Sequence, residues 1–155
     1  MKNAPADVRL AYVAALKLLG RRELSEAQVR QRLVRAGFST DAVTDAVHAL
    51  RAERAIDDER VARAAARTEA VVKRRGRLRV VRYIESLGID AGVARRAADE
   101  VFGELDPDES LRQAIERRYK GRRPTGDKQV AQAFRYLVGQ GYEPERVLKI
   151  LKSRQ

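Results

Sequence analysis

The segment from Gly121 to Lys128 comes closest in this chain to a phosphate-binding loop. It reads Gly-Arg-Arg-Pro-Thr-Gly-Asp-Lys, with two glycines and a lysine. In a nucleotide-binding P-loop the lysine directly follows the second glycine, and a serine or threonine follows the lysine. Here Asp127 separates the second glycine from the lysine, no hydroxyl residue follows, and no strand-like segment precedes the loop. We therefore predict that this loop does not bind a nucleotide.

Acidic and histidine side chains provide two further candidates for chemistry. Asp57, Asp58 and Glu59 are consecutive, and consecutive helical positions point in different directions, so helix capping is a better interpretation than metal binding. His48 is the only histidine, and no second ligand stands at helical spacing from it. Because the chain has no cysteine, disulfides, thiolate zinc sites and cysteine nucleophiles are excluded. We predict a protein that is not an enzyme and that uses no cofactor.

Basic side chains are the remaining candidates for function. Lysine and arginine number 33 against 22 acidic residues, which gives a formal net charge of +11 at pH 7. The excess is spread along the chain, with 10 basic against 6 acidic residues in 1–55, 11 against 8 in 56–103 and 12 against 8 in 104–155. Such a surplus predicts attraction to a polyanion. The alternative is a solvated surface that only keeps the protein soluble.

Three clusters concentrate this charge, at residues 21–22, 73–82 and 117–123. The second cluster lies in a stretch with no acidic residue between Ala70 and Ile84. Contact with phosphates or with an acidic protein surface is the function that such clusters predict. The candidate binding residues are Arg21, Arg22, Lys73, Arg74, Arg75, Arg77, Arg79, Arg82, Arg117, Arg118, Lys120, Arg122 and Arg123.

The elements that position these clusters follow a repeat of about 50 residues. Gly37, Gly88 and Gly141 lie 51 and 53 residues apart, and a large apolar residue follows each glycine. Apolar residues four and eight positions before each glycine fall on one helical stripe. These positions hold Leu33 and Val29, Ile84 and Val80, and Leu137 and Ala133. Each glycine is expected to end its helix, because glycine adopts the left-handed conformation without strain.

A further helical segment precedes each glycine-terminated helix, over roughly 7–20, 58–73 and 107–119, and an apolar stripe follows each glycine. Ser25 and Gln28 have the spacing of a capping box, and Asp106-Pro107 is typical of a helix start. No segment alternates with period two over a length sufficient for a strand. The prediction is an all-α fold of three tandem three-helix repeats, at residues 1–55, 56–103 and 104–155.

A unit of this size buries only a small core, so the three units could stack into one bundle or lie in an elongated, curved row. The alanine-rich stripes and charged connectors favour the row. All three basic clusters fall where the first helix of a unit meets its second, and this repetition favours a binding function over a solvated face. Residues 1–7 lack an apolar signal core, and no apolar run approaches ~18 residues. We therefore expect a soluble, cytoplasmic protein that does not enter a membrane.

Several of these segments resemble the RecX family of regulatory proteins. The first unit is similar through ALKLLGRRELSE (15–26), VRQRL (29–33) and AGF (36–38). The family's most recognisable stretch resembles AIDDERVA (55–62), and Arg75-Gly76 and LGI (87–89) continue the second unit. YLVGQGY (136–142) carries a looser resemblance in the third unit. The chain departs from the family at Val61, where phenylalanine is usual, and at Leu78 or Arg79, where a small residue is often found.

The resemblance implies a function that the composition alone does not predict. RecX-like proteins bind the RecA recombinase, lie in the groove of its filament on single-stranded DNA, and inhibit ATP hydrolysis and strand exchange. The chain would then modulate recombination, DNA repair and the SOS response as a monomer, with the basic clusters contacting the filament and single-stranded, or also double-stranded, DNA. A free-standing DNA-binding protein is the alternative, although no second helix has the residue mixture typical of base readout. A protein scaffold is the third hypothesis.

Overall fold

The computed structural model describes residues 5–153, which form nine α-helices and one short π-helix and contain no strand. The helices are α1 (Pro5–Arg21), α2 (Glu26–Arg35), α3 (Thr40–Ala52), α4 (Asp58–Arg67), the π-helix η1 (Thr68–Val72), α5 (Arg77–Ser86), α6 (Ala91–Gly103), α7 (Pro107–Tyr119), α8 (Gly126–Gly139) and α9 (Pro144–Lys152). None of the helices in this range is long and apolar enough to span a bilayer.

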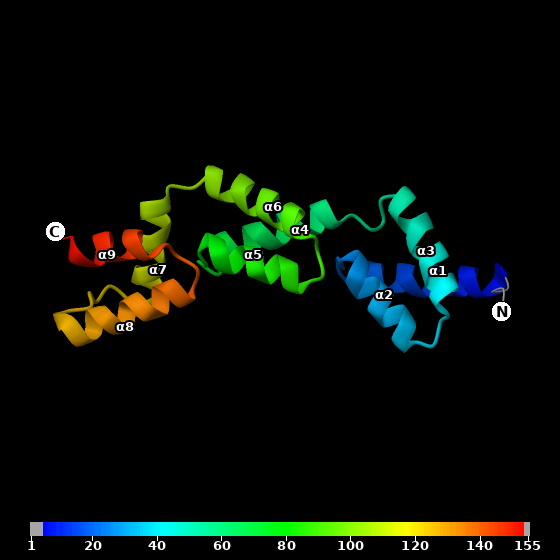
Figure 1. The fold of residues 1–155 in the computed structure, drawn as a ribbon, viewed down its shortest axis with the longest axis horizontal. Coiled ribbons are helices and arrows are strands. Elements are labelled where there is room, and N and C mark those ends of the chain that lie inside the picture. The colour runs from blue at the N-terminus through cyan, green and yellow to red at the C-terminus, as the bar shows by residue number, and fades with distance from the viewer. Residues whose placement is uncertain (1–4, 154–155) are drawn as a thin grey trace.

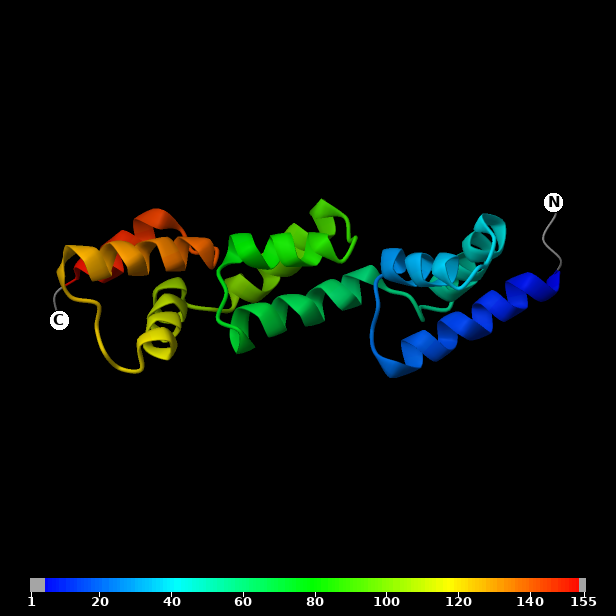
Figure 2. The same cartoon turned by 90° about the horizontal axis from the view of Figure 1, so that it is seen from below.

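The helices form three groups of three, which lie in an elongated row with the chain termini at opposite ends (Figure 1). We call α1–α3 unit one, α4–α6 unit two and α7–α9 unit three. Seen from below, the first helices of the units lie along one edge of the row, and the second helices lie along the opposite edge (Figure 2). The predicted all-α fold of tandem three-helix repeats in an elongated row is confirmed.

Each unit has its own hydrophobic core. Leu33 and Leu50 centre the core of unit one, Val80 and Ile84 that of unit two, and Leu137 that of unit three, all of them at most 1% exposed. These residues lie on the predicted stripes. No core cluster of residues 5–153 combines side chains of two units, as expected for a repeat protein whose modules contact only their neighbours.

One residue departs from the predicted division of the chain. Ile56, expected to open the second repeat, is buried in the core of unit one, beside Leu50 and Leu24. The amide of Ile56 donates to the carbonyl of Leu50 at 3.2 Å. The chain therefore folds back onto α3 before α4 begins at Asp58.

The three glycine stops are present as predicted. Gly37, Gly88 and Gly141 have φ values of +95°, +80° and +97°. In unit one the amide of Phe38 donates to the carbonyl of Leu33 at 3.2 Å, which closes the Schellman pattern that a left-handed residue allows. The glycine thus ends the second helix of each unit and turns the chain toward the third.

Units one and two meet where the glycine turn of unit two contacts the start of α2. Ser25 forms the predicted capping box with Gln28, and its hydroxyl also donates to the carbonyl of Leu87. The amide of Glu26 donates to Asp58 Oδ1 at 2.9 Å. A Cβ built on Gly88 would lie 2.4 Å from the Cβ of Ala27. We call this contact joint A.

Units two and three meet at the equivalent place, which we call joint B. The amide of Gly76, just before α5, donates to the carbonyl of Gln140 at 2.8 Å, and the amide of Leu78 donates to that of Gly141 at 3.3 Å. A Cβ on Gly76 would lie 2.3 Å from the carbonyl carbon of Gly141. In both joints, therefore, the glycine turn of one unit docks on the second helix of the unit before it.

Candidate binding surface

The basic clusters lie where first and second helices meet, in the connecting loops and in the adjoining parts of the helices. Local backbone geometry shapes two of these loops. Before α5, the π-helix ends at Val72 and Arg74 has a positive φ of 54°. After α7, Lys120 and Gly121 have φ values of 50° and 81°. Consecutive left-handed residues turn the chain sharply, so the side chains on either side point into the space between neighbouring helices.

These side chains line three neighbouring open hollows. Lys73 lines both the first and the second hollow, and Arg118 and Lys120 line both the second and the third. The shared residues show that the hollows follow one another along the row and across joint B. We call the basic residues that line them the basic strip, which consists of Arg22, Lys73, Arg74, Arg75, Arg79, Arg117, Arg118, Lys120, Arg122 and Arg123.

Three of the predicted binding residues do not line these hollows. Arg77 turns toward α6, where its guanidinium lies 2.7 Å from Asp99. Arg21 and Arg82 are exposed and belong to none of the three hollows. Successive residues of a helix differ by about 100° in direction, so a cluster that is contiguous in sequence does not all face one side.

A buried carboxylate anchors part of the basic strip. Glu69 on the π-helix is 1% exposed and lies 2.8 Å from Lys73 Nζ, and it also contacts the guanidinium of Arg75. Removing a partner from a buried charge costs on the order of 3–5 kcal/mol. Lys73 and Arg75 therefore stabilise the fold. Nothing in the sequence pattern had distinguished Glu69 from the surface acids.

That contact decides which residues can be changed in a binding test. Replacing the whole second cluster with alanine would remove both partners of Glu69. Because Arg75 and Lys73 neutralise Glu69, their loss would destabilise the end of the first helix of unit two. Variants that test binding should instead change strip residues whose side chains make no ion pair and no hydrogen bond within residues 5–153, which are Arg22, Arg74, Arg79, Arg118, Lys120 and Arg122.

Two tyrosine rings support cations of the strip. Lys73 Nζ lies 5.5 Å from the ring centre of Tyr83, and the Arg118 guanidinium lies 4.7 Å from that of Tyr136. Such contacts hold a long basic side chain in place while its charge stays accessible. Neither tyrosine is among the residues predicted for the site, although Tyr83 lies four residues from Arg79 on α5.

Contacts of the backbone fix the strip across joint B. The Arg117 guanidinium donates to the carbonyl of Val72, and the Tyr142 hydroxyl donates to that of Arg74 at 2.7 Å. Burial raises the pKa of Tyr142 to about 12, so this donor keeps its proton throughout the physiological range. The basic side chains of units two and three are therefore held against one another by contacts that do not titrate near neutral pH.

The acidic trio and the histidine have other places in the structure. Asp57 caps α4 by accepting from the Arg60 amide at 3.1 Å, and Asp58 belongs to joint A. Burial raises the pKa of Asp58 above its ordinary value, although the Glu26 amide opposes this shift. His48 is exposed on α3. Within residues 5–153, no three metal-ligating side chains lie together. The Gly121–Lys128 segment consists of the loop after α7 and the first three residues of α8.

Comparisons with known proteins identify relatives of the chain. The model of the RecX first three-helix domain matches residues 11–50. The regulatory protein RecX of Syntrophotalea carbinolica is 33% identical over 138 residues, which cover 85% of this chain and 88% of that protein. RecX of Geobacillus kaustophilus is 30% identical over 149 residues, and the match spans 94% of this chain but 54% of that longer protein.

A solved structure shares the fold of the whole row. The crystal structure of RecX from Lactobacillus salivarius matches with a TM-score of 0.77, covering 96% of this chain and 98% of that one. Its sequence identity is 16%, so the likeness shows a common arrangement of helices.

Proposed function

Since the chain belongs to the RecX family of regulatory proteins, we propose that it binds the RecA filament on single-stranded DNA and inhibits ATP hydrolysis and strand exchange. The observation that carries this proposal is the basic strip, which runs along an elongated row and crosses joint B. A row of units is a suitable shape for the groove of a helical filament, where it would meet acidic protein surface and DNA phosphates together.

The charge of the strip supports this mode of attachment. Eight strip residues make no ion pair with an acid of residues 5–153, although the chain has 22 acidic residues. Six of them, all except Arg117 and Arg123, also make no side-chain hydrogen bond. Such side chains are available to neutralise phosphates, and phosphate neutralisation supplies most sequence-independent affinity for DNA. We propose that the strip contacts the filament and that Arg21, Arg77 and Arg82 contribute less than the sequence suggested.

Inhibition would follow from attachment and needs no catalytic group. A rigid body that occupies the groove over several RecA subunits restrains the changes that each cycle of ATP hydrolysis requires. It would bind the nucleoprotein state more tightly than free RecA, because that state presents protein and DNA surfaces side by side. A ligand shifts an equilibrium only by its difference in affinity between two states, so this difference is the source of regulation.

The experiment is a RecA ATPase assay on single-stranded DNA, with this protein titrated from far below to slightly above one molecule per RecA subunit. We expect inhibition. Inhibition well below that ratio indicates filament capping or disassembly, and inhibition near saturation indicates groove coating. Unchanged ATPase activity at one molecule per subunit contradicts the proposal. Tight binding to naked duplex DNA in the same buffer would then favour the free-standing DNA-binding alternative.

A further inference from the structure

Tyr119, at the end of α7, differs from the other tyrosines of the chain. The hydroxyls of Tyr12 and Tyr142 donate to Glu53 and to a backbone carbonyl, and the rings of Tyr83 and Tyr136 each carry a cation. Within residues 5–153, the Tyr119 hydroxyl has no hydrogen bond and no cation lies over its ring, although its backbone carbonyl accepts from the Arg122 amide at 2.9 Å. It is partly exposed. An aromatic side chain that is neither in a core nor engaged by a neighbour is available to a ligand.

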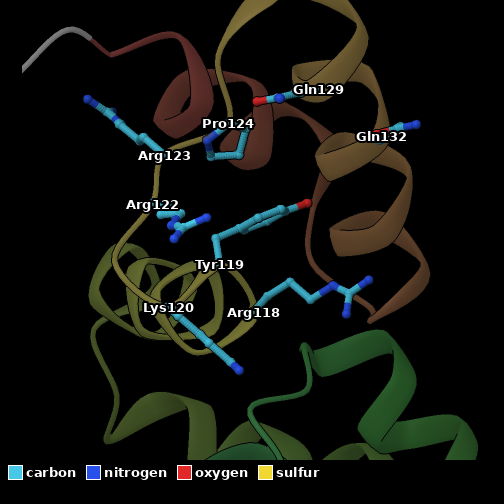
Figure 3. A pocket seen from close by; sticks show the side chains of 8 residues that line it. All are labelled: Arg118, Tyr119, Lys120, Arg122, Arg123, Pro124, Gln129 and Gln132. Atoms are coloured by element: carbon cyan, nitrogen blue, oxygen red, sulfur yellow. The ribbon is translucent and has the colours of Figure 1, made fainter.

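Tyr119 lies in the third hollow, between the α7–α8 loop and α8 (Figure 3). Its ring extends across the hollow, with Arg122 on one side and Arg118 on the other. Gln129 and Gln132 line the hollow from α8, and their spacing of three residues puts both on one helical face. One ring, several cations and two amides thus surround a single open space.

The hollow is formed before any ligand arrives. The Arg123 guanidinium points away from it and donates to the carbonyl of Ser153 at 2.6 Å. At the other end of the loop, the Thr125 amide donates to Gln129 Oε1 at 2.9 Å. Lys120 and Gly121, both left-handed, turn the chain immediately after Tyr119. The loop is thereby fixed to α9 and to α8, and the position of Tyr119 is fixed with it.

This combination of groups fits an unpaired nucleotide. Bases stack on aromatic rings in single-stranded nucleic acid, and nearby cations follow the backbone, whereas the faces of bases in a duplex are covered by their neighbours. An acidic protein surface would pair with Arg118 and Arg122 but would gain little from the tyrosine ring. We propose that the third hollow binds one unpaired DNA base stacked on Tyr119, with the flanking phosphates at Arg118, Lys120 and Arg122.

This inference rests on the proposed function in taking single-stranded DNA as a partner, and it is tested without RecA. Fluorescence anisotropy would compare a labelled oligothymidylate of about 12 nucleotides with an abasic oligonucleotide of equal length and charge. Both would be titrated with the full chain and with two variants. Tyr119→Phe keeps the ring, and Tyr119→Leu removes the ring but keeps apolar volume. Circular dichroism checks that the variants keep their helix content.

We expect the natural chain and Tyr119→Phe to bind the base-bearing strand about tenfold more tightly than the abasic strand. Tyr119→Leu should lose most of that difference while binding the abasic strand as the natural chain does. The proposal is overturned if the natural chain binds both strands equally or binds neither. It is also overturned if Tyr119→Leu retains the discrimination, or if it weakens both strands by the same factor, which would give the tyrosine a structural role. The RecA ATPase assay separately decides the proposed function, because inhibition by the natural chain does not require base discrimination.

Discussion

Joint A and joint B occupy the same place in the repeat but are built from different groups. In joint A, side chains make the contacts: the Ser25 hydroxyl, the Asp58 carboxylate and the Ala27 methyl group. In joint B, backbone meets backbone at Gly76 and Gly141. The glycine turn therefore has two functions, to end a helix and to let a neighbouring unit approach. Close approach requires glycine more strictly in joint B, because no substitution can remove the backbone atoms that a Cβ would meet there.

The free turn of unit one separates these two functions. Gly37 has a positive φ like its counterparts, but a Cβ built on it would meet nothing within 4 Å. No unit precedes unit one within the described residues, so Gly37 only ends its helix. The three glycines therefore provide an internal series, with strain alone at Gly37, strain and a methyl contact at Gly88, and strain and a backbone contact at Gly141.

The largest effect is expected for Gly141→Ala. The new Cβ would lie 2.4 Å from the Arg79 amide nitrogen. Alanine is also disfavoured at this position because the backbone is left-handed. We expect a loss of roughly 2–5 kcal/mol in the free energy of unfolding, from overpacking together with backbone strain. Urea unfolding followed by circular dichroism measures it. A loss below about 1 kcal/mol would show that joint B is not closely packed.

Gly76→Ala is the companion variant, because φ at Gly76 is −78° and introduces no strain. Its whole cost comes from the overlap with the backbone of Gly141, so we expect about 1–3 kcal/mol. The same unfolding measurement applies. A loss of unfolding free energy as small as that of an exposed surface substitution would contradict the close contact between the two backbones.

Gly88→Ala tests joint A and should lower the free energy of unfolding by an intermediate amount, roughly 2 kcal/mol. Gly88→Val should lower it further. The clash in this case is with the methyl group of Ala27, so Ala27→Gly should relieve part of it. A double-mutant cycle should give a favourable coupling of about 1 kcal/mol between the two substitutions. Additive effects would contradict the contact, and no equivalent rescue exists in joint B.

Much of this architecture was predictable from the chain. The stripes ending at Leu33, Ile84 and Leu137 and the glycines that follow them are local patterns, and local patterns fix helix faces and helix ends. The capping box at Ser25 was recognised for the same reason. The joints were not predicted, because a close approach depends on which surfaces meet, and neither Gly76 nor Gly88 indicates its partner.

The position of the binding surface could be predicted from the sequence, but not which side chains belong to it. The clusters lie at the junctions of first and second helices, partly in the loops and partly in the adjoining helices. The direction of each side chain was not, so Arg77 was included although it pairs with Asp99. Glu69 was missed because its burial results from packing around the π-helix, and Tyr119 was missed because a single aromatic residue carries no pattern.

Gly37→Ala should have a smaller effect, about 1–2 kcal/mol, because only the left-handed conformation is penalised. It is the control for the other two glycine turns and is measured in the same way. A cost equal to that of Gly141→Ala would mean that strain, and not contact between units, dominates throughout the series.

The smallest expected effect is a difference in pH dependence between the joints. Burial raises the pKa of Asp58 in joint A, so the folded state binds this proton more tightly than the unfolded state does. Above the pKa that Asp58 has in the folded state, its ionised carboxylate lowers the free energy of unfolding. This unfavourable contribution is lost as the pH falls through that pKa toward the pKa of the unfolded state. Joint B has no such group, because Tyr142 titrates at about 12.

Urea unfolding of the natural chain and of Asp58→Asn, at neutral pH and at mildly acidic pH, isolates this group. The natural chain should gain stability relative to the variant as the pH falls. A relative loss would mean that the ionised form of Asp58 is the one that stabilises joint A.

The most direct test of the basic strip compares two variants of equal charge in the RecA ATPase assay over a range of salt concentrations. One variant changes Arg79, Arg118 and Arg122 to glutamine, and the other changes Arg9, Arg63 and Arg95, which are exposed and outside the strip. Each single-strand phosphate contributes about −0.7 to the slope of log affinity against log salt, so the strip variant should flatten that slope by about 2. It should also inhibit RecA less, while the second variant inhibits as the natural chain does. Equal inhibition by both variants at every salt concentration would contradict the assignment of this surface.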